Sequence, residues 1–187
     1  KAGFAATEAE VQGEFETFRK VIKMTQRFES LMHSDNKISF HLISSAGGLF
    51  EGQKCVSQPL NPHPVRPYGQ FKKMQEDLLL SLPEWLVKKI YRLSSVYGYI
   101  RKGHRMGLIS TLILNGVRQQ VSNIYGNLST LRDYVWCGDL SKYIANTLLN
   151  TEGEDNHVID YLVSGKPSSI HEIQYIIEEL IGRKIYI

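Results

Sequence analysis

The sequence predicts an α/β protein with a parallel sheet, and three observations indicate this class. An amphipathic helix pattern over residues 13–33 is followed by a polar turn and a short apolar strand over residues 38–43. Such a continuous run of apolar and β-branched residues is typical of strands buried in parallel sheets. Small polar tips, Ser44-Ser45 and Ser94-Ser95, follow two predicted strands. Ligands bind at that edge of open α/β sheets, so these tips are candidate binding positions.

Composition excludes several classes of protein. The 187 residues fit one domain or one and a half, and 42% hydrophobic with 22% charged residues is ordinary for a soluble protein. No stretch is apolar for long enough to span a membrane, and no secretion signal is visible at the start. The net charge of +3 is scattered; the basic segment 101–105 lacks interleaved aromatics, so we expect no nucleic-acid partner. Cys55 and Cys137 are too few for a disulfide framework or zinc site, which indicates a reduced, cytoplasmic setting without a metal.

The segment after the first predicted strand carries the candidate chemistry. A Gly-rich turn and a proline-rich connection lead to a helix predicted from Tyr68 to about Leu80, with Phe71, Met74, Leu78 and Leu79 facing inward. Tyr68 and Lys72 stand at i and i+4, so they share one face of this helix. A Tyr acting as a base near neutral pH needs its pKa lowered by roughly 3 units from ~10, and a neighbouring cation supplies part of that shift. Two alternatives to a catalytic site remain. The i, i+4 spacing of Tyr68 and Lys72 occurs by chance in many helices, and the Gly-rich turn can serve only to reverse the chain.

The rest of the chain continues the alternation of strands and helices. Arg132 stands in an otherwise apolar strand, where it either binds a ligand or forms a structural salt bridge with Asp133 or another acid. The further predicted elements are a strand at 88–96, a helix at 108–114 closed by Asn115-Gly116, strands at 121–125 and 131–136, a helix at 140–149 capped by Asp139, a strand at 158–163, and a helix from Ser168 or Ser169 to Ile181 with Glu172 in a capping box and Gly182 as the stop.

Six short segments occur in an order that is familiar from one family. They are Ile43-Ser44-Ser45-Ala46, Pro67-Tyr68-Gly69 with Lys72, Arg92-Leu93-Ser94-Ser95-Val96-Tyr97-Gly98, Ile124-Tyr125-Gly126, Leu131-Arg132-Asp133-Tyr134-Val135 with Asp139-Leu140, and Ser164-Gly165-Lys166-Pro167-Ser168-Ser169. By these segments the chain resembles the extended short-chain dehydrogenase/reductase superfamily, and within it the NAD-dependent nucleotide-sugar epimerase/dehydratase family typified by UDP-glucose 4-epimerase.

The resemblance implies a Rossmann-like parallel sheet with helices on both faces and a small C-terminal substrate domain. Residues 1–98 would form part of the cofactor domain, and residues 99–187 mostly the substrate-binding subdomain, with 131–150 returning to the core. The glycine fingerprint that cradles the cofactor's phosphates does not occur in this sequence, so the family's N-terminal βαβ unit, roughly 70 residues, is expected to be missing.

The resemblance also implies roles for individual residues. Tyr68 would be the acid/base on a sugar hydroxyl, and Lys72 would lower its pKa and hold the nicotinamide ribose of NAD or NADP. Ser94 and Ser95 would line the nicotinamide and the sugar, and Arg132 would grip the diphosphate.

The serine partner of Tyr68 is less well defined by the pattern. Counted back from Phe50, the family's usual Ser/Thr position falls on Ala46, which would then line the substrate. The catalytic hydroxyl would come from Ser45 or Ser44, the latter also near the cofactor. Members of the resembled family with 4,6-dehydratase activity tend to carry Thr-Asp-Glu at this strand end. Residues 46–48 contain no acids, so the resemblance argues against that chemistry.

The expected function is therefore an NAD(P)-dependent nucleotide-sugar epimerase, or a related reductase or decarboxylase, in sugar or surface-polysaccharide metabolism. It would act by reversible hydride transfer, which makes it an isomerase with oxidoreductase chemistry. The alternative is a non-catalytic remnant that binds a nucleotide sugar or a protein partner without cofactor. By resemblance we expect a homodimer, with the helices at 13–33 and 68–80 as candidate contacts.

Overall fold

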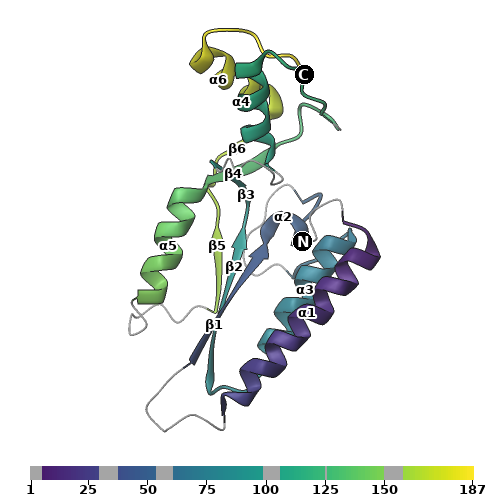
Figure 1. Cartoon of the computed structure of the whole chain (residues 1–187), viewed down its shortest axis with the longest axis vertical. Coiled ribbons are helices and arrows are strands. Elements are labelled where there is room, and N and C mark those ends of the chain that lie inside the picture. The colour runs from purple at the N-terminus through teal and green to yellow at the C-terminus, as the bar shows by residue number, and fades with distance from the viewer. Residues whose placement is uncertain (1–5, 30–37, 54–60, 99–105, 125, 150–157) are drawn as a thin grey trace. The chain divides into compact units, whose positions relative to one another are not determined.

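The computed structural model describes residues 6–29, 38–53, 61–98, 106–124, 126–149 and 158–187 (Figure 1). The chain divides into two compact units. Unit 1 consists of Lys1–Leu93 and Asp155–Tyr161, and unit 2 consists of Ser94–Glu154 and Leu162–Ile187. The predicted domain boundary at residue 98 stays a prediction about the intact protein. Cys55 and the basic segment 101–105 lie outside the described residues.

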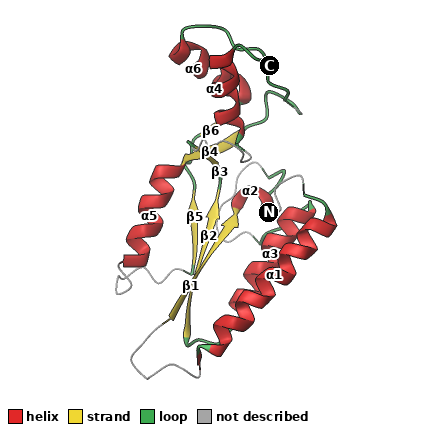
Figure 2. Cartoon of the chain, in the orientation of Figure 1, coloured by secondary structure: helices red, strands yellow, loops and turns green. Residues whose placement is uncertain are grey.

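Helices and parallel strands alternate in unit 1, as the secondary-structure colouring of Figure 2 shows. Strand β1 pairs with β2 in parallel, from Ile38 opposite Leu86 to Ser45 opposite Leu93, and the sheet order is β1-β2-β5. This confirms the predicted α/β class with a parallel sheet flanked by helices. The elements are α1 (Glu8–Arg27), β1 (Ile38–Ser45), α2 (Ala46–Leu49), α3 (Pro67–Leu80), β2 (Leu86–Leu93) and β5 (Ile159–Leu162).

Helix α1 begins earlier than predicted because the sequence contains a capping box that the periodicity did not reveal. The Thr7 hydroxyl accepts the backbone N–H of Glu10, and the Glu10 carboxylate accepts the backbone N–H of Thr7 at 2.8 Å. Two donors at the helix start are thereby satisfied reciprocally. The helix ends at Arg27 with Phe28 as its cap, so the predicted range of 13–33 is wrong at its start, and residues 30–33 lie outside the described residues.

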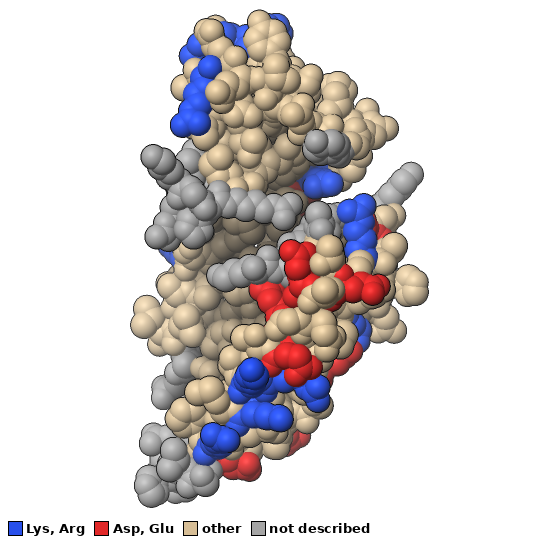
Figure 3. Space-filling view, turned by 45° about the vertical axis from the view of Figure 1, so that its right-hand side comes forward, with Lys and Arg blue, Asp and Glu red and all other residues tan. Residues whose placement is uncertain are grey.

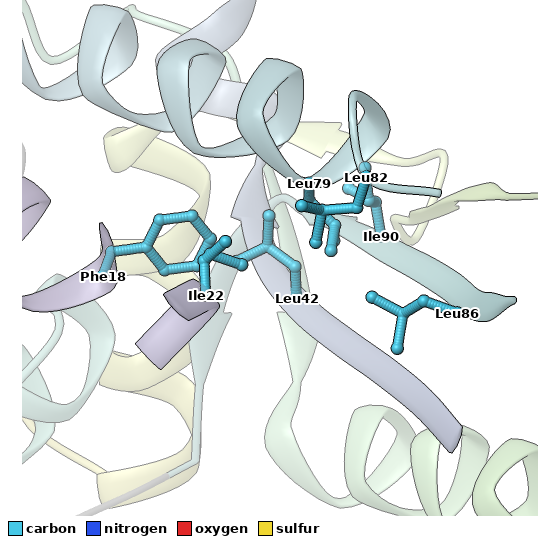
Figure 4. Close-up of a cluster of buried hydrophobic side chains, with 7 residues drawn as sticks. All are labelled: Phe18, Ile22, Leu42, Leu79, Leu82, Leu86 and Ile90. Atoms are coloured by element: carbon cyan, nitrogen blue, oxygen red, sulfur yellow. The ribbon is translucent and has the colours of Figure 1, made fainter. Parts of the chain in front are cut away.

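Helices α1 and α3 run side by side along one face of the β1-β2-β5 sheet (Figure 1). Seven buried apolar side chains join the two helices to the sheet, and each stabilises the fold by about 1.5–3 kcal/mol relative to full exposure. Met74, predicted to face inward, is 43% exposed and does not take part. The seven residues drawn in Figure 4 are Phe18, Ile22, Leu42, Leu79, Leu82, Leu86 and Ile90.

Unit 2 contains short strands and three helices within its described residues. Strand β3 pairs with β4 in parallel, and β4 pairs with β6 in the antiparallel sense. Helices α4 and α6 bury Leu112, Ile177 and Ile185 together. The elements are β3 (Ser95–Tyr97), α4 (Leu108–Arg118), β4 (Arg132–Trp136), α5 (Cys137–Leu149), β6 (Pro167–Ser168) and α6 (Ile170–Ile181).

Helix α4 does not stop at Asn115-Gly116 as predicted. It continues to Arg118, and Gln119 ends it in the left-handed conformation at φ 58°. Gly116 serves packing instead: a Cβ there would lie 2.6 Å from Cγ2 of Ile185. A glycine read as a stop signal is in fact a contact point with the C-terminal segment.

Other predictions in unit 2 are partly corrected. Among the described residues of 121–125 there is no strand, and α5 begins at Cys137, so Asp139 lies in its first turn rather than at its cap. An acid in the first turn still favours the helix through its dipole. The predicted capping box of α6, Ser169 with Glu172, is confirmed, and Gly182 ends that helix in the left-handed conformation at φ 68°.

Candidate active site

The two serines at the end of β1 have different surroundings. Because successive side chains of a strand point to opposite faces, Ser44 and Ser45 cannot serve the same contact. Ser44 is 3% exposed, and its hydroxyl donates to Glu76 Oε1 on α3 at 2.5 Å. Ser45 instead lies at the transition to α2, where its hydroxyl oxygen accepts the backbone N–H of Gly48 at 3.1 Å.

Ser44 belongs to a buried polar network that holds α3 to the sheet. Arg92 of β2 donates to both oxygens of Glu76, from Nε to Oε1 at 3.1 Å and from Nη2 to Oε2 at 2.7 Å. A further Arg92 nitrogen donates to the Tyr161 hydroxyl, and the guanidinium lies 5.6 Å from the centroid of the Phe50 ring. Two parallel charge-assisted bonds between planar groups fix geometry strongly. The network therefore sets the position of α3 along the strands.

Ser45 forms a side-chain hydrogen bond with Tyr68 at the start of α3. Because the Ser45 oxygen accepts the Gly48 N–H, the hydroxyl hydrogen of Ser45 stays available for donation to the Tyr68 phenol oxygen. Of the two predicted serines, Ser45 is thus the one that the structure brings to Tyr68. Ser44 is not brought there, because its proton is donated to Glu76.

Two glycines allow this contact between α2 and α3. A Cβ on Gly69 would lie 2.0 Å from the carbonyl oxygen of Gly48, and a Cβ on Gly48 would lie 3.0 Å from Cε1 of Tyr68. Any larger residue at Gly69 would force the two backbones apart. The Gly-rich turn after β1 is therefore a short helix whose bare surface packs against the Tyr68 ring.

Lys72 lies one turn after Tyr68, as the i, i+4 spacing predicted. Its ammonium donates to the backbone oxygen of Ile43 at 3.1 Å and to Oε1 of Gln75 at 3.2 Å. The same nitrogen is 5.9 Å from the centroid of the Tyr68 ring and 5.5 Å from that of Phe71. The Lys72 charge thus lies over the aromatic rings.

Burial and neighbouring charges set the protonation of the pair. Burial raises the pKa of the Tyr68 phenol; the hydrogen bond with Ser45 partly counteracts this, and the Glu14 carboxylate of α1 adds to it. Burial lowers the pKa of the Lys72 ammonium, and the carboxylates of Glu14 and Glu76 act in the opposite direction. The resemblance implied a Tyr68 pKa lowered by Lys72, whereas here the net shift is upward. Burial is the largest cause of this upward shift of the Tyr68 pKa, and the Lys72 ammonium donates its hydrogen bonds to Ile43 and Gln75.

The remaining predicted site residues lie in two places. Ala46 is the first residue of α2, directly after Ser45, whereas Ser94, Ser95 and Arg132 belong to unit 2. Arg132 is exposed at the start of β4.

The carboxylate of Asp133 was one candidate salt-bridge partner of Arg132. It accepts two hydrogen bonds from Ser164 instead. Asp133 accepts the backbone N–H and the hydroxyl of Ser164 at 2.9 and 2.7 Å. Burial acts to raise the pKa of Asp133, but interactions with Ser94, Ser164 and the Gly165 N–H outweigh it, so that the net shift is downward. The Ser94 hydroxyl makes no hydrogen bond of standard geometry within the described residues, yet it lies close enough to Asp133 to contribute to the lowered pKa. Asp133 therefore fixes the turn after β5.

Sequence reasoning missed three charged residues of this region. Glu76 follows Lys72 by four residues on the same helix, and Arg92 directly follows the apolar pair Ile90-Tyr91 in a strand, so both carried a signal. Glu14 follows buried Val11 by three residues and precedes buried Phe18 by four, which places it on the packed face of α1. A charge at an apolar position of the helical pattern was the available clue.

The described residues offer no sign of two other kinds of site. No group of three or more His, Cys, Asp or Glu side chains that could hold a metal ion occurs among them. Within the same part of the chain, no helix has both the length and the apolar character that crossing a membrane requires.

Comparison with known sequences gives a family match over most of the chain. Residues 2–162 match the family described as "NAD dependent epimerase/dehydratase family". A protein of Methanocaldococcus jannaschii named "Putative UDP-glucose 4-epimerase" is 32% identical over 151 residues, which are 75% of this chain and 47% of that protein.

Solved structures of similar fold include two that were determined in complex with NAD. MoeE5 in complex with UDP-glucose and NAD has a TM-score of 0.66 at 27% identity, over 79% of this chain and 50% of that one. The UDP-glucose 4-epimerase of Thermus thermophilus in complex with NAD has a TM-score of 0.66 at 21% identity, over 80% of this chain and 50% of that one. The chain thus spans about half the length of the relatives it matches.

Proposed function

The chain belongs to the NAD-dependent epimerase/dehydratase family, and from that premise we propose that its intact protein is a nucleotide-sugar epimerase in which Tyr68 is the acid/base. The observation that carries the proposal is the cluster of Ser45, Tyr68 and Lys72 at the carboxyl end of a parallel strand. A hydroxyl, a phenol and an ammonium meet there in the arrangement that proton transfer to and from a sugar hydroxyl needs.

The donor set of Lys72 fits a dinucleotide. An ammonium has three N–H donors, and the bonds to Ile43 and Gln75 leave one for a further acceptor such as a ribose hydroxyl. Bound NAD would accept a hydride from the sugar carbon and return it, which is the chemistry that residues of this chain cannot supply. Lys72 would hold the ribose, with Ser94 and Ser95 near the nicotinamide, and the role predicted for Ser44 passes to Ser45.

In this proposal Tyr68 accepts the proton of the sugar hydroxyl while the carbon is oxidised, and returns it after the ring has turned. Its raised pKa keeps the phenol protonated near neutral pH, which suits the returning step. Acceptance of the proton needs the phenolate to be stabilised by several kcal/mol more, on the scale of about 1.4 kcal/mol per pKa unit. A positively charged nicotinamide close to the phenol would provide part of that stabilisation. The Ser45 hydroxyl would orient the same sugar oxygen.

The proposed substrate is a sugar linked to a nucleoside diphosphate. Arg132, exposed on β4, can form a bidentate contact with a diphosphate, and Ala46 offers an apolar surface beside Ser45. The named relatives support a UDP-sugar, since MoeE5 was solved with UDP-glucose. We also propose a homodimer through α1 and α3, which sedimentation of the intact protein at several concentrations tests.

The test compares wild-type intact protein with Tyr68→Phe, assayed for interconversion of UDP-glucose and UDP-galactose with NAD present. The account predicts a loss of kcat by about 10² to 10⁴ with dinucleotide affinity retained, because a general acid/base contributes that much. Tyr97→Phe, which alters a tyrosine of unit 2, is the matched control and should keep most of its activity. Wild-type protein that neither binds NAD nor acts on these or other nucleotide sugars contradicts the proposal.

A further inference from the structure

The second face of the β1-β2-β5 sheet carries a group of polar side chains. Leu42 and Ile90 belong to the core between the sheet and the helices, so the side chains next to them along the strands point to the opposite face. Strands of a parallel sheet usually present apolar side chains on both faces. This sheet departs from that pattern at four residues, which are His41 of β1, Lys89 and Tyr91 of β2, and Asp160 of β5.

Direct contacts hold the His41 ring against β2. Its Nδ1 lies 2.8 Å from the hydroxyl oxygen of Tyr91, and the two rings stack with their centroids 5.8 Å apart. Tyr91 itself is fully buried. Lys89 lies directly opposite His41 in the parallel register of β1 and β2. The Lys89 ammonium pairs with Oδ2 of Asp160 at 3.0 Å, so the four residues lie together across three strands.

Charged groups rarely lie as deep as they do in this cluster. Most charged side chains of a protein are on its surface, where Figure 3 shows them in separate acidic and basic areas. The side chains of Lys89 and Asp160 are only 8% and 9% exposed. The Nε2 atom of His41 is buried as well, and it has no hydrogen-bond partner in the part of the chain that the structure describes. A proton added to the ring there would meet neither water nor an acceptor.

The surroundings disfavour a charged His41 ring whichever nitrogen carries the proton of the neutral form. A neutral imidazole has one N–H and one acceptor nitrogen, whereas the charged ring has an N–H on both. In the charged ring Nδ1 can no longer accept from the Tyr91 hydroxyl, and the buried Nε2–H has no acceptor among the described residues. Burial and then the neighbouring Lys89 ammonium lower the pKa of His41. Asp160 on β5 acts in the opposite sense, but its ion pair with Lys89 compensates its charge.

We propose that His41 is an acid-sensitive switch of unit 1, which joins β1 to β2 as a neutral ring and loosens that contact when it takes up a second proton. The inference goes beyond the proposed function and does not rest on it. An unfolded His titrates near pH ~6.5, whereas the folded His41 titrates lower. The unfolding free energy is therefore highest above the unfolded value, and it falls as pH drops from there to the folded midpoint. Because β1 ends at Ser45, a loosened β1 would also disturb the candidate active site.

The first experiment measures urea denaturation of the intact protein at a series of pH values below neutral. One extra proton bound by the unfolded chain raises the unfolding constant by up to about 10-fold per pH unit between the two midpoints. His41→Asn, whose amide can replace Nδ1 but does not titrate, should lack this part of the pH dependence. His171→Gln is the matched control, since His171 is exposed on α6, and it should keep the wild-type slope. Parallel profiles of wild-type protein and His41→Asn overturn the inference.

A second experiment reads the His41 ring itself, so the inference stays testable if His41→Asn does not fold. The titration is followed by NMR of protein with ¹⁵N-labelled histidine, and the His41 signal is assigned by its loss in His41→Asn or His41→Phe. Its midpoint should lie below ~6.5 in wild-type protein and rise in Lys89→Met, where a cation is lost and Asp160 is left unpaired. A wild-type midpoint at or above that value overturns the inference. Neither experiment uses NAD or a nucleotide sugar, so its outcome is separate from that of the epimerase proposal.

Discussion

Two polar groups meet at the end of β1 and differ in how completely they are bonded. The Ser44 group is a closed network in which one carboxylate, one guanidinium and two hydroxyls satisfy one another in the interior. The Ser45 group, one residue further along, combines Tyr68 and Lys72 in half-buried positions and retains an N–H for a further partner. The Ser44 group therefore holds the site in place, whereas the Ser45 group has a donor left with which to bind a ligand.

The comparison also explains why one strand end serves both purposes. Buried ion pairs are costly to desolvate, so a fully bonded pair is stable only with fixed geometry. That rigidity is what Tyr68 needs, because its phenol has to meet Ser45 across a gap that leaves no room for a Cβ at Gly69. We therefore expect damage to the first group to appear as lost stability, and damage to the second as lost turnover.

The largest effect on stability is expected from Glu76→Ala. It leaves the Arg92 guanidinium buried without its carboxylate, which costs about 3–5 kcal/mol of unfolding free energy. Urea denaturation of the intact protein measures this change. Replacing both partners, as in Glu76→Leu with Arg92→Met, should recover much of the loss because no charge is stranded. Equal stability of wild-type and Glu76→Ala would contradict the assigned role of the network.

A somewhat smaller effect is expected from Gly69→Ala. The added Cβ would overlap the Gly48 carbonyl oxygen at 2.0 Å, so α2 and α3 must separate, at about 1–3 kcal/mol. The separation should also carry Tyr68 away from Ser45 and reduce turnover. Gly47→Ala is the matched control: nothing lies within 4 Å of its Cβ position, so thermal denaturation should show equal or slightly higher stability.

The smallest effect is expected at Asp133, outside both groups. Its pKa is lowered in the folded chain, so its contribution to stability is present above the unfolded pKa and is lost as pH falls through the lower folded value. Asp133→Asn should lower the unfolding free energy modestly near neutral pH, and its difference from wild-type protein should disappear as pH falls, so that its profile is flatter in that acidic range. Thermal melts at a series of pH values test this. An Asp133→Asn profile as steep as that of wild-type protein would assign the acid response to other carboxylates.

Sequence reasoning reached the class of fold because helix and strand patterns are local. It also placed Tyr68 and Lys72 on one helix face from their i, i+4 spacing, while the role of this pair came from the family resemblance and stays a proposal. It did not separate Ser44 from Ser45, since that choice depends on which face of β1 meets Glu76, a residue 32 positions away. It misread Gly116 as a stop signal because Ile185, which needs the bare Cα, is distant in the sequence.

The most direct test of the account is a comparison of Ser44→Ala with Ser45→Ala in the intact protein, measuring kcat/KM for a UDP-sugar and the unfolding free energy of each. The account predicts that Ser45→Ala loses about 10-fold to 10²-fold in kcat/KM, because it removes a donor at the reacting oxygen. It should also lose about 0.5–1 kcal/mol of stability, because the Gly48 N–H at the start of α2 loses its acceptor. Ser44→Ala should lose about 1–3 kcal/mol of stability, because a buried carboxylate loses a donor, while keeping most of its turnover. The opposite pattern, with turnover lost at Ser44 and stability lost at Ser45, would contradict the division between the two groups.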